Sequence, residues 1–167
     1  MTQTVKIALL GAGGVGKSTI ASRLVTGSYV DQNMTIGLDV ESWSLQDCNG
    51  NCFVNASIFD LGGQEHFRFF QEEFVKGSSL ILIVFDVSRF PTFFDIDEWT
   101  QMIHEIPKDR ILLIGNKVDE GVSVSTEQIQ KKSDELGINH ILISTKTGKN
   151  FNQLVNFLEN TLSEICS

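Results

Sequence analysis

The sequence predicts an α/β fold with a six-stranded, mostly parallel sheet and helices on both faces. Three almost wholly apolar runs, Lys6–Leu10, Leu80–Asp86 and Ile111–Asn116, are typical of parallel strands that are buried on both faces. Segments with helical spacing separate these runs, which is the pattern of repeated βαβ units. Two neighbouring segments, Leu38–Asp47 and Cys52–Phe59, are joined by a short connection, which predicts one antiparallel hairpin at an edge of the sheet.

The remaining elements follow in chain order. A glycine-rich turn and a helix from Lys17 to about Thr26 come after the first strand, and Asn49-Gly50 supplies the hairpin turn. Ser125 followed by Gln128 is a capping-box signature, and Gly137 is a suitable helix stop. The later elements are expected as helices near Pro91–Ile106, Thr126–Leu136 and Phe151–Ile165 and a last strand at His140–Ser144.

Composition indicates one compact domain over residues 1–167. A hydrophobic fraction of 41% and a charged fraction of 20% are ordinary for a globular chain. The net charge of −8 argues against nucleic acid or an anionic membrane as the main partner. The odd number of cysteines, Cys48, Cys52 and Cys166, predicts reduced cytoplasmic thiols. A disulfide or metal site at Cys48 and Cys52 is the alternative.

Signals for a lipid anchor are absent from the sequence as given. Residue 2 is Thr, so there is no myristoylation signal, and Cys166 is penultimate, so there is no terminal prenylation box. No stretch is long and apolar enough to span a bilayer. We therefore expect a cytoplasmic protein that lies peripherally on a membrane only through a lost tail or a partner.

The segment Gly11–Ser18 (GAGGVGKS) matches the phosphate-binding pattern G-x-x-x-x-G-K-S between a strand and a helix. Such a turn directs backbone N–H groups and the helix dipole at an anion. Gly11 and Gly16 let the backbone approach phosphate oxygens, Lys17 reaches the β- and γ-phosphates, and Ser18 can ligate Mg²⁺. An ordinary glycine-rich turn is the alternative, which the full pattern disfavours.

A second segment, Asn116–Asp119 (NKVD), follows a buried strand. The Asp119 carboxylate can accept from the N1–H and N2–H₂ groups of guanine, whereas adenine offers it no such donors. Asn116 is expected to tie this segment to the phosphate loop, and the Lys117 stem to lie over the base. The backbone of Ser144-Thr145-Lys146 can donate to the guanine O6. Alone, each of these segments could be a surface turn.

A third segment, Asp60–Gln64 (DLGGQ), completes the set. Asp60 is expected near Mg²⁺ through a water, and the Gly63 N–H near a γ-phosphate. Gln64 can orient a water for attack. The candidate catalytic residues are therefore Gln64, Lys17 and Gly63.

These segments together resemble the small GTPases of the Ras superfamily over nearly the whole chain. TIGLDV at Thr35–Val40, FDVS at Phe85–Ser88, Trp99 and STKTGKN at Ser144–Asn150 are similar to Rab and Ras types. Gly62–Gln64 instead resembles Arf proteins and heterotrimeric Gα subunits, because Rab and Ras types usually have Ala-Gly-Gln there. The resemblance implies a P-loop NTPase G domain with GTP/GDP as substrate and product and Mg²⁺ as cofactor.

The resemblance also implies particular roles. Thr35 would ligate Mg²⁺ and meet the γ-phosphate, and Tyr29 would pack on the guanine edge. Met34 stands where proline is usual, the segment from Lys17 to Thr35 is one residue shorter than in Ras, and Thr145 replaces an alanine. The predicted metal set is Ser18, Thr35 and Asp60. The predicted nucleotide-binding set is Gly13, Gly14, Val15, Gly16, Lys17, Ser18, Thr19, Tyr29, Thr35, Gly63, Asn116, Lys117, Asp119, Ser144, Thr145 and Lys146.

Two functional hypotheses follow. In the first, the chain is a slow GTPase whose switch I (about residues 28–40) and switch II (about 61–77) order around GTP and bind an exchange factor, an activating protein and effectors in signalling or trafficking. In the second, the nucleotide is structural, and the aromatic segment with Phe67, Phe69, Phe70 and Phe74 presents an interaction surface without appreciable hydrolysis.

Overall fold

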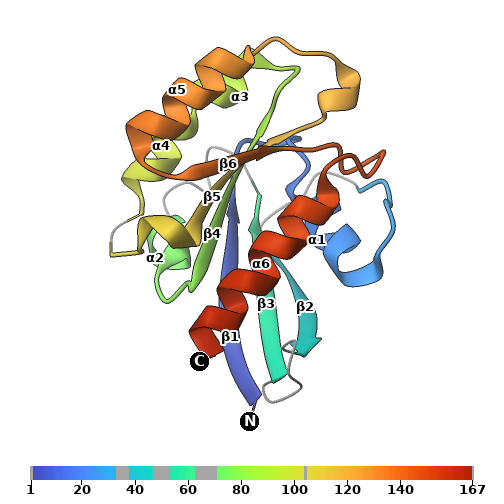
Figure 1. Cartoon of the computed structure of the whole chain (residues 1–167), viewed down its shortest axis with the longest axis vertical. Helices are drawn as coiled ribbons and strands as arrows, with labels where there is room; N and C mark the ends of the chain where they lie inside the picture. The colour runs from blue at the N-terminus through green and yellow to red at the C-terminus, as the bar shows by residue number, and fades with distance from the viewer. Residues whose placement is uncertain (1, 33–37, 47–52, 63–70, 104, 167) are drawn as a thin grey trace.

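A computed structural model of the chain describes residues 2–32, 38–46, 53–62, 71–103 and 105–166. Within these residues, six strands form one sheet in the order β2-β3-β1-β4-β5-β6, in which only the β2–β3 pair is antiparallel (Figure 1). The predicted mostly parallel sheet with one antiparallel edge hairpin is confirmed. The strands are β1 (Thr2–Leu10), β2 (Leu38–Gln46), β3 (Phe53–Leu61), β4 (Leu80–Asp86), β5 (Ile111–Asn116) and β6 (Asn139–Leu142).

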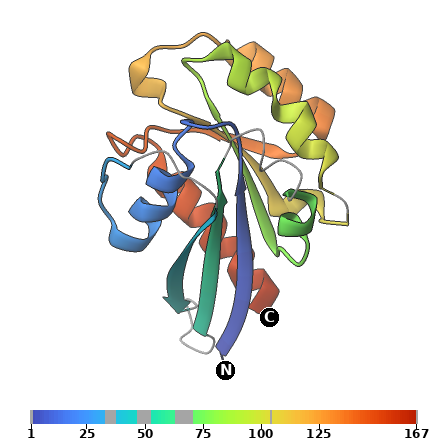
Figure 2. The same ribbon diagram turned by 180° about the vertical axis from the view of Figure 1, so that it is seen from behind.

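Helices cover both faces of this sheet, as the sequence predicts. Figure 1 looks onto α6, which crosses in front of the strands, and Figure 2 shows the same helix behind them. The helices are α1 (Lys17–Thr26), α2 (Gln71–Val75), α3 (Phe90–Phe94), α4 (Ile96–Gln101), α5 (Thr126–Leu136) and α6 (Phe151–Cys166), with short 3₁₀ turns at Lys108–Arg110 and Val118–Glu120.

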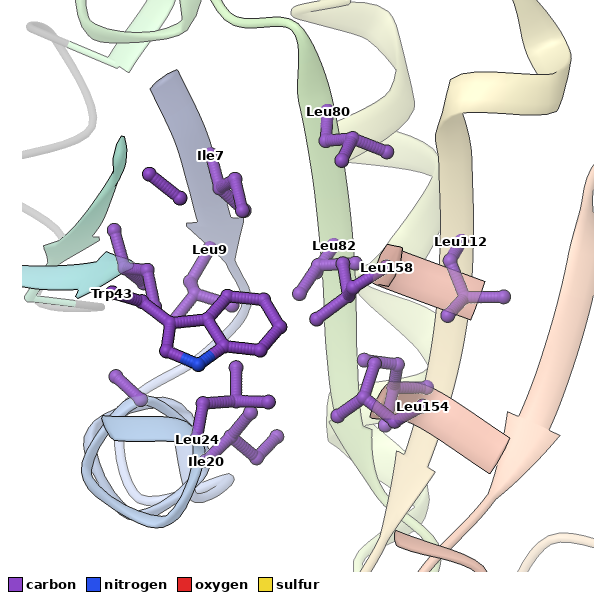
Figure 3. Packing of buried hydrophobic residues seen from close by; sticks show 14 of the residues in the cluster. Ile7, Leu9, Ile20, Leu24, Trp43, Leu80, Leu82, Leu112, Leu154 and Leu158 are labelled. Atoms are coloured by element: carbon purple, nitrogen blue, oxygen red, sulfur yellow. The ribbon is translucent and has the colours of Figure 1, made fainter. Parts of the chain in front are cut away.

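The alternation of side chains along the central strands creates two separate cores. On one face, alternate residues of β1 such as Ile7 and Leu9 pack with α1, α6 and Trp43 of β2. Figure 3 shows the Trp43 ring between Leu9 and the α1 residues Ile20 and Leu24. Burying a large apolar side chain contributes about 1.5–3 kcal/mol, so this face fixes α1, and with it the phosphate loop, against the sheet.

The other face carries the helices α2 to α5. Ala8 and Leu10 of β1 point to this side, and they share a core with Phe93 of α3 and Trp99 of α4. Ile129 of α5 belongs to the same core. The central strands are therefore held from both sides, and their C-terminal ends are fixed in relation to one another.

One predicted helix is divided. The expected helix Pro91–Ile106 is instead α3 and α4, which meet at Asp95, and α4 ends at Gln101. Asp95 has φ −73° and ψ −9°, a shallow turn rather than continuous helix. Beyond α4, Glu105 has φ 71°, a left-handed conformation that a helix does not tolerate. Pro107 also disfavours helix at the residue before it.

Other boundaries shift less. The last strand ends at Leu142 rather than Ser144, although the Ile143 N–H still donates to the Gly115 carbonyl at 2.7 Å. The first strand begins at Thr2 because its polar half pairs with β3. The five-residue helix α2 is not predicted, whereas α5 has the predicted capping box and glycine stop. The hairpin turn Asn49-Gly50 and the side chains of Cys48, Cys52 and Cys166 lie outside the described residues.

Within the described ranges, no helix is both long enough and apolar enough to cross a bilayer.

Candidate nucleotide-binding site

The phosphate-binding loop lies between β1 and α1, at the end of the sheet opposite the start of β1 and the end of α6 (Figure 1). Gly16 caps α1 with φ 103°, and a Cβ there would lie 2.3 Å from Asn116 Nδ2. A Cβ on Gly11 would lie 2.3 Å from the Val84 carbonyl oxygen. Both positions therefore need glycine, for backbone conformation and for close approach.

Lys17 places a positive charge against this loop. Its side chain is buried, and its Nζ donates to the Gly11 carbonyl at 2.8 Å and to the Ala12 carbonyl at 3.0 Å. Burial lowers the pKa of Lys17 to about 8, and the negative charge of Asp60 partly opposes this shift. An anion in the loop would compensate the buried ammonium group, so the site is suited to phosphate.

Ser18 and Asp60 form the candidate metal site. Asp60 belongs to β3, is 2% exposed, and accepts a hydrogen bond at Oδ2 from the Ser18 hydroxyl at the start of α1. A hydroxyl and a carboxylate are hard oxygen ligands, and Mg²⁺ is typically held by one or two protein oxygens together with phosphates and waters. The donor set therefore fits Mg²⁺ beside a phosphate.

The loop after β5 is joined to the phosphate loop by hydrogen bonds. Asn116 is buried, and its Nδ2 donates to the Val15 carbonyl at 3.0 Å. Its Oδ1 accepts from the Thr145 N–H at 3.2 Å and from the Thr145 hydroxyl at 3.0 Å. Lys117 Nζ donates to the Gly14 carbonyl at 2.8 Å. The geometry agrees with the predicted link between the Asn116 segment and the phosphate loop.

Asp119 is positioned by the loop after β6. The buried Ser144 hydroxyl donates to Asp119 Oδ1 at 2.6 Å and accepts from the Thr147 N–H at 3.0 Å. Behind this loop, Arg23 of α1 donates to the Thr145 carbonyl at 2.8 Å and lies 5.2 Å from the centre of the Phe151 ring. A carboxylate can accept about four hydrogen bonds, so Asp119 retains the capacity to bind a donor edge.

A cleft of about 330 Å³ joins the phosphate loop to the Asp119 loop, a volume typical of small-molecule sites. Asp60, Asp31, Gln32 and Glu120 also line it. Of the predicted nucleotide-binding residues, twelve line this cleft: Gly13, Gly14, Gly16, Lys17, Ser18, Thr19, Tyr29, Asn116, Lys117, Asp119, Thr145 and Lys146.

Of the other predicted residues, two are described but do not line the cleft, and three lie outside the described residues. The Val15 and Ser144 side chains are fully buried behind the cleft, where Ser144 acts on Asp119. Tyr29 does line the cleft, and a hydrogen bond to the Asp31 carboxylate raises the pKa of Tyr29 to about 12. Thr35, Gly63 and Gln64 lie outside the described residues, as do Met34, Phe67, Phe69 and Phe70.

Two residues of this region, Asp86 and Arg89, are missed by the sequence reasoning. Asp86 ends β4 and is 2% exposed, and its Oδ2 lies 3.2 Å from Arg89 Nε and 3.7 Å from Lys117 Nζ. Arg89 Nη2 donates to the Gly13 carbonyl at 2.9 Å. The sequence signal that could have identified Asp86 is a carboxylate at the C-terminal end of a central strand, because sheets of this class bind ligands there.

Comparison with known proteins places the chain in a family. The family model described as "Ras family" matches residues 6–164. The Ras-related protein SEC4 of Saccharomyces cerevisiae is 34% identical over 164 residues, covering 96% of this chain and 75% of that protein. The GTP-binding protein YPTM2 of Zea mays is 33% identical over 89% of this chain and 74% of its own length.

The Ras-related protein RABD2c of Arabidopsis thaliana is likewise 33% identical, over 87% of this chain and 73% of that protein. The matched region contains the phosphate loop, the Asp60 segment and both loops of the cleft. The chain therefore belongs to the Ras family and is a small GTPase.

Proposed function

We propose that this protein is a GTP-binding molecular switch that hydrolyses GTP slowly to GDP and phosphate, in signalling or trafficking. The observation that carries the proposal is the single cleft in which a buried lysine at the phosphate loop and a positioned aspartate lie at opposite ends. A purine nucleotide presents a phosphate chain and a base edge to these two ends.

The base end discriminates guanine from adenine. Asp119 accepts from the guanine N1–H and N2–H₂ groups, while the Thr145 and Lys146 backbone donates to O6. Adenine would leave the carboxylate facing a lone pair. Sites that depend on such hydrogen bonds reject the wrong analogue by roughly 10⁴-fold or more. The Ser144 hydroxyl, which contacts Asp119 Oδ1 at 2.6 Å, keeps the carboxylate in one orientation.

The phosphate end binds the diphosphate and the γ-phosphate. Lys17 supplies positive charge, and the loop amides of Gly13 to Thr19 supply donors. Ser18 and Thr35 would hold Mg²⁺ directly, and Asp60 would hold it through a water. Mg²⁺, when bound, neutralises phosphate charge. The Ser18–Asp60 contact supports this assignment for two of the three residues.

Hydrolysis depends on positioning. Gln64 orients the attacking water, and Lys17 and the Gly63 N–H stabilise charge on the γ-phosphate. No arginine occurs between Gly27 and Gly37, so switch I supplies no arginine to the transition state. We expect intrinsic turnover on the order of 10⁻⁴–10⁻³ s⁻¹, as in Ras-type enzymes, and acceleration by a partner's arginine of up to about 10⁵-fold. Gly13 leaves space for that arginine, since no described residue has an atom within 4 Å of the position its Cβ would take.

The switch cycle links hydrolysis to partner binding. The γ-phosphate contacts Thr35 and Gly63, which orders switch I and switch II, and its loss releases both segments. Exchange factors, activating proteins and effectors bind these two segments. Phe74 at the end of switch II is half-buried against the core, and it contributes to both the packing and the surface there.

Single-turnover phosphate release tests the proposal. The GTP-loaded protein is compared with Gln64→Leu and with Gln101→Leu, which alters an exposed glutamine at the end of α4. Wild type and Gln101→Leu should release phosphate at the same slow rate, and Gln64→Leu at least about tenfold more slowly. Tight GTP binding without any phosphate release from wild type would favour the interaction module instead. A rate near about 1 s⁻¹ without a partner would also contradict the proposal.

A further inference from the structure

Three consecutive carbonyl groups of the phosphate loop accept hydrogen bonds from side chains outside the loop. The donors come from two neighbouring regions, the end of β4 and the end of β5, which pair in the sheet. The three bonds are Arg89 Nη2 to Gly13 at 2.9 Å, Lys117 Nζ to Gly14 at 2.8 Å, and Asn116 Nδ2 to Val15 at 3.0 Å.

Fixing a carbonyl also fixes the next amide. The peptide unit is planar and trans, so the N–H of the following residue points to the opposite side from the C=O. Arg89 is not among the residues that line the cleft, while Gly13 and Gly14 are. The Gly13 carbonyl is thus bonded to a side chain that does not line the cleft, and the Gly14 N–H points to the opposite side of the peptide. Gly14 has φ 77°, a conformation that glycine leaves easily unless its neighbours hold it.

The buried carboxylate of Asp86 orients both Arg89 and Lys117. Asp86 Oδ2 lies 3.2 Å from Arg89 Nε and 3.7 Å from Lys117 Nζ, and Asp86 Oδ1 accepts from the Ser88 N–H at 2.9 Å. The Asp86 side chain is 2% exposed, whereas that of Arg89 is 48% exposed. Arg89 therefore uses one edge of its guanidinium to join a fixed anion to a loop carbonyl, a geometry that the planar fork of arginine allows.

We propose that Arg89, oriented by Asp86, is a positioning residue that holds the phosphate loop in its binding conformation and thereby slows nucleotide dissociation. It acts through the Gly13–Gly14 peptide rather than by touching the nucleotide. The inference rests on the proposed nucleotide binding. A hydrogen bond from a charged donor to a carbonyl is stronger than one from a neutral donor. A carbonyl polarised by such a donor also makes the N–H of the same peptide a better hydrogen-bond donor.

The test is the dissociation rate of fluorescently labelled GDP from the full chain. Arg89→Ala should release GDP about five- to twentyfold faster than wild type, the size expected for one hydrogen bond to a charged group at a partly exposed site. Arg89→Lys, which keeps the charge but loses the fork, should lie between the two. Lys132→Ala is the matched control, because it removes a cation of α5 that pairs with Asp97 of α4 at 3.0 Å and with Glu135 at 3.6 Å.

A second readout separates positioning from general damage. Guanosine lacks the phosphates, so its affinity in a competition titration should be the same for Arg89→Ala and wild type, while GDP affinity falls. An equal loss of guanosine and GDP affinity would overturn the proposal, because it would indicate a disturbed base site.

The role of Arg89 and the proposed function can fail separately. Unchanged GDP dissociation in Arg89→Ala, with tight binding by wild type, would overturn the role of Arg89 and leave the proposed function standing. Failure of wild type to retain GDP would overturn the proposed function itself, and this inference with it.

Discussion

At the residue scale, the site depends on glycines, which have no Cβ atom, as much as on its side chains. Gly16 begins α1 with φ 103°, and the Asn116 amide that fixes the Val15 carbonyl occupies the space that a Cβ would need. The same amide group therefore both orders the loop and requires glycine next to it. Glycine at Gly16 follows from two independent demands, backbone conformation and contact with the next loop.

Gly16→Ala tests this reasoning. The added Cβ strains a left-handed residue and displaces Asn116, so the dissociation constant for GDP should rise at least about tenfold. Gly27→Ala is the matched control at the other end of α1, since Gly27 has φ 79° but, in the part of the chain that the structure describes, nothing lies within 4 Å of the position a Cβ would take. Isothermal titration with GDP should show unchanged affinity for the control. Equal GDP affinity for Gly16→Ala and wild type would show that the loop does not need this glycine.

At the element scale, the short helix α2 is fastened to the sheet by one cation. Lys6 Nζ of β1 lies 4.9 Å from the centre of the Phe59 ring and 5.1 Å from that of Phe74. It donates to the Phe74 carbonyl, and to the Lys76 carbonyl at 3.1 Å, and so caps the C-terminal end of α2. The two rings meet edge to face at 5.7 Å. The end of switch II is thus attached to β1 and to β3 beside Asp60.

Lys6→Met should loosen this attachment, because it keeps the apolar stem but removes the charge and both hydrogen bonds. We expect a loss of about 1–2 kcal/mol in the free energy of unfolding, measured with urea. Hydrogen exchange should accelerate in α2 before it does so in β4. Lys76→Met is the control, because the Lys76 side chain forms an exposed ion pair with Glu73, and its urea midpoint should match wild type. A Lys6→Met midpoint equal to that of the control would contradict the capping role.

The elements show what sequence patterns capture. The apolar runs at β4 and β5 and the caps of α5 were predictable because the signal is local. The division of the 91–106 segment at Asp95 was not, since α3 and α4 each bury their own aromatic residue, Phe93 and Trp99, in the same core. The helix α2 has five residues, too few for a periodic pattern, and its cap comes from a residue in β1.

The residues of the site could likewise be predicted where the signal is local in the sequence. Contiguous motifs identified the residues that line the cleft, including Lys17, Asn116 and Asp119. The bond from Arg89 to the Gly13 carbonyl joins positions that are 76 residues apart, and only the pairing of β1 with β4 brings these loops together. Tertiary contacts of this kind leave no pattern in a single sequence.

At the scale of the whole molecule, the net charge is −8, whereas cationic side chains are bonded to the phosphate loop. Lys17, Lys117 and Lys146 line the cleft, and Arg89 lies behind the loop. This distribution disfavours binding to extended polyanions, while the helix terminus and the buried ammonium group still attract a compact phosphate chain. Selectivity between nucleotides then depends on the base end of the cleft, and above all on Asp119.

The Asp119→Asn variant tests whether Asp119 determines which base is bound. An amide can donate to the C2 oxygen of xanthine, so this variant should weaken GTP binding and strengthen binding of xanthosine triphosphate. Because the exposed Asp119 side chain has no role in either core, the variant should fold normally.

The most direct test of the account is a competition titration in which GTP and ATP displace fluorescently labelled GDP from the wild-type chain. We predict that GTP displaces the probe stoichiometrically and that ATP is weaker by roughly 10⁴-fold or more. Displacement by ATP at the same concentrations as GTP would contradict the account, because the cleft would then bind phosphates without recognising guanine.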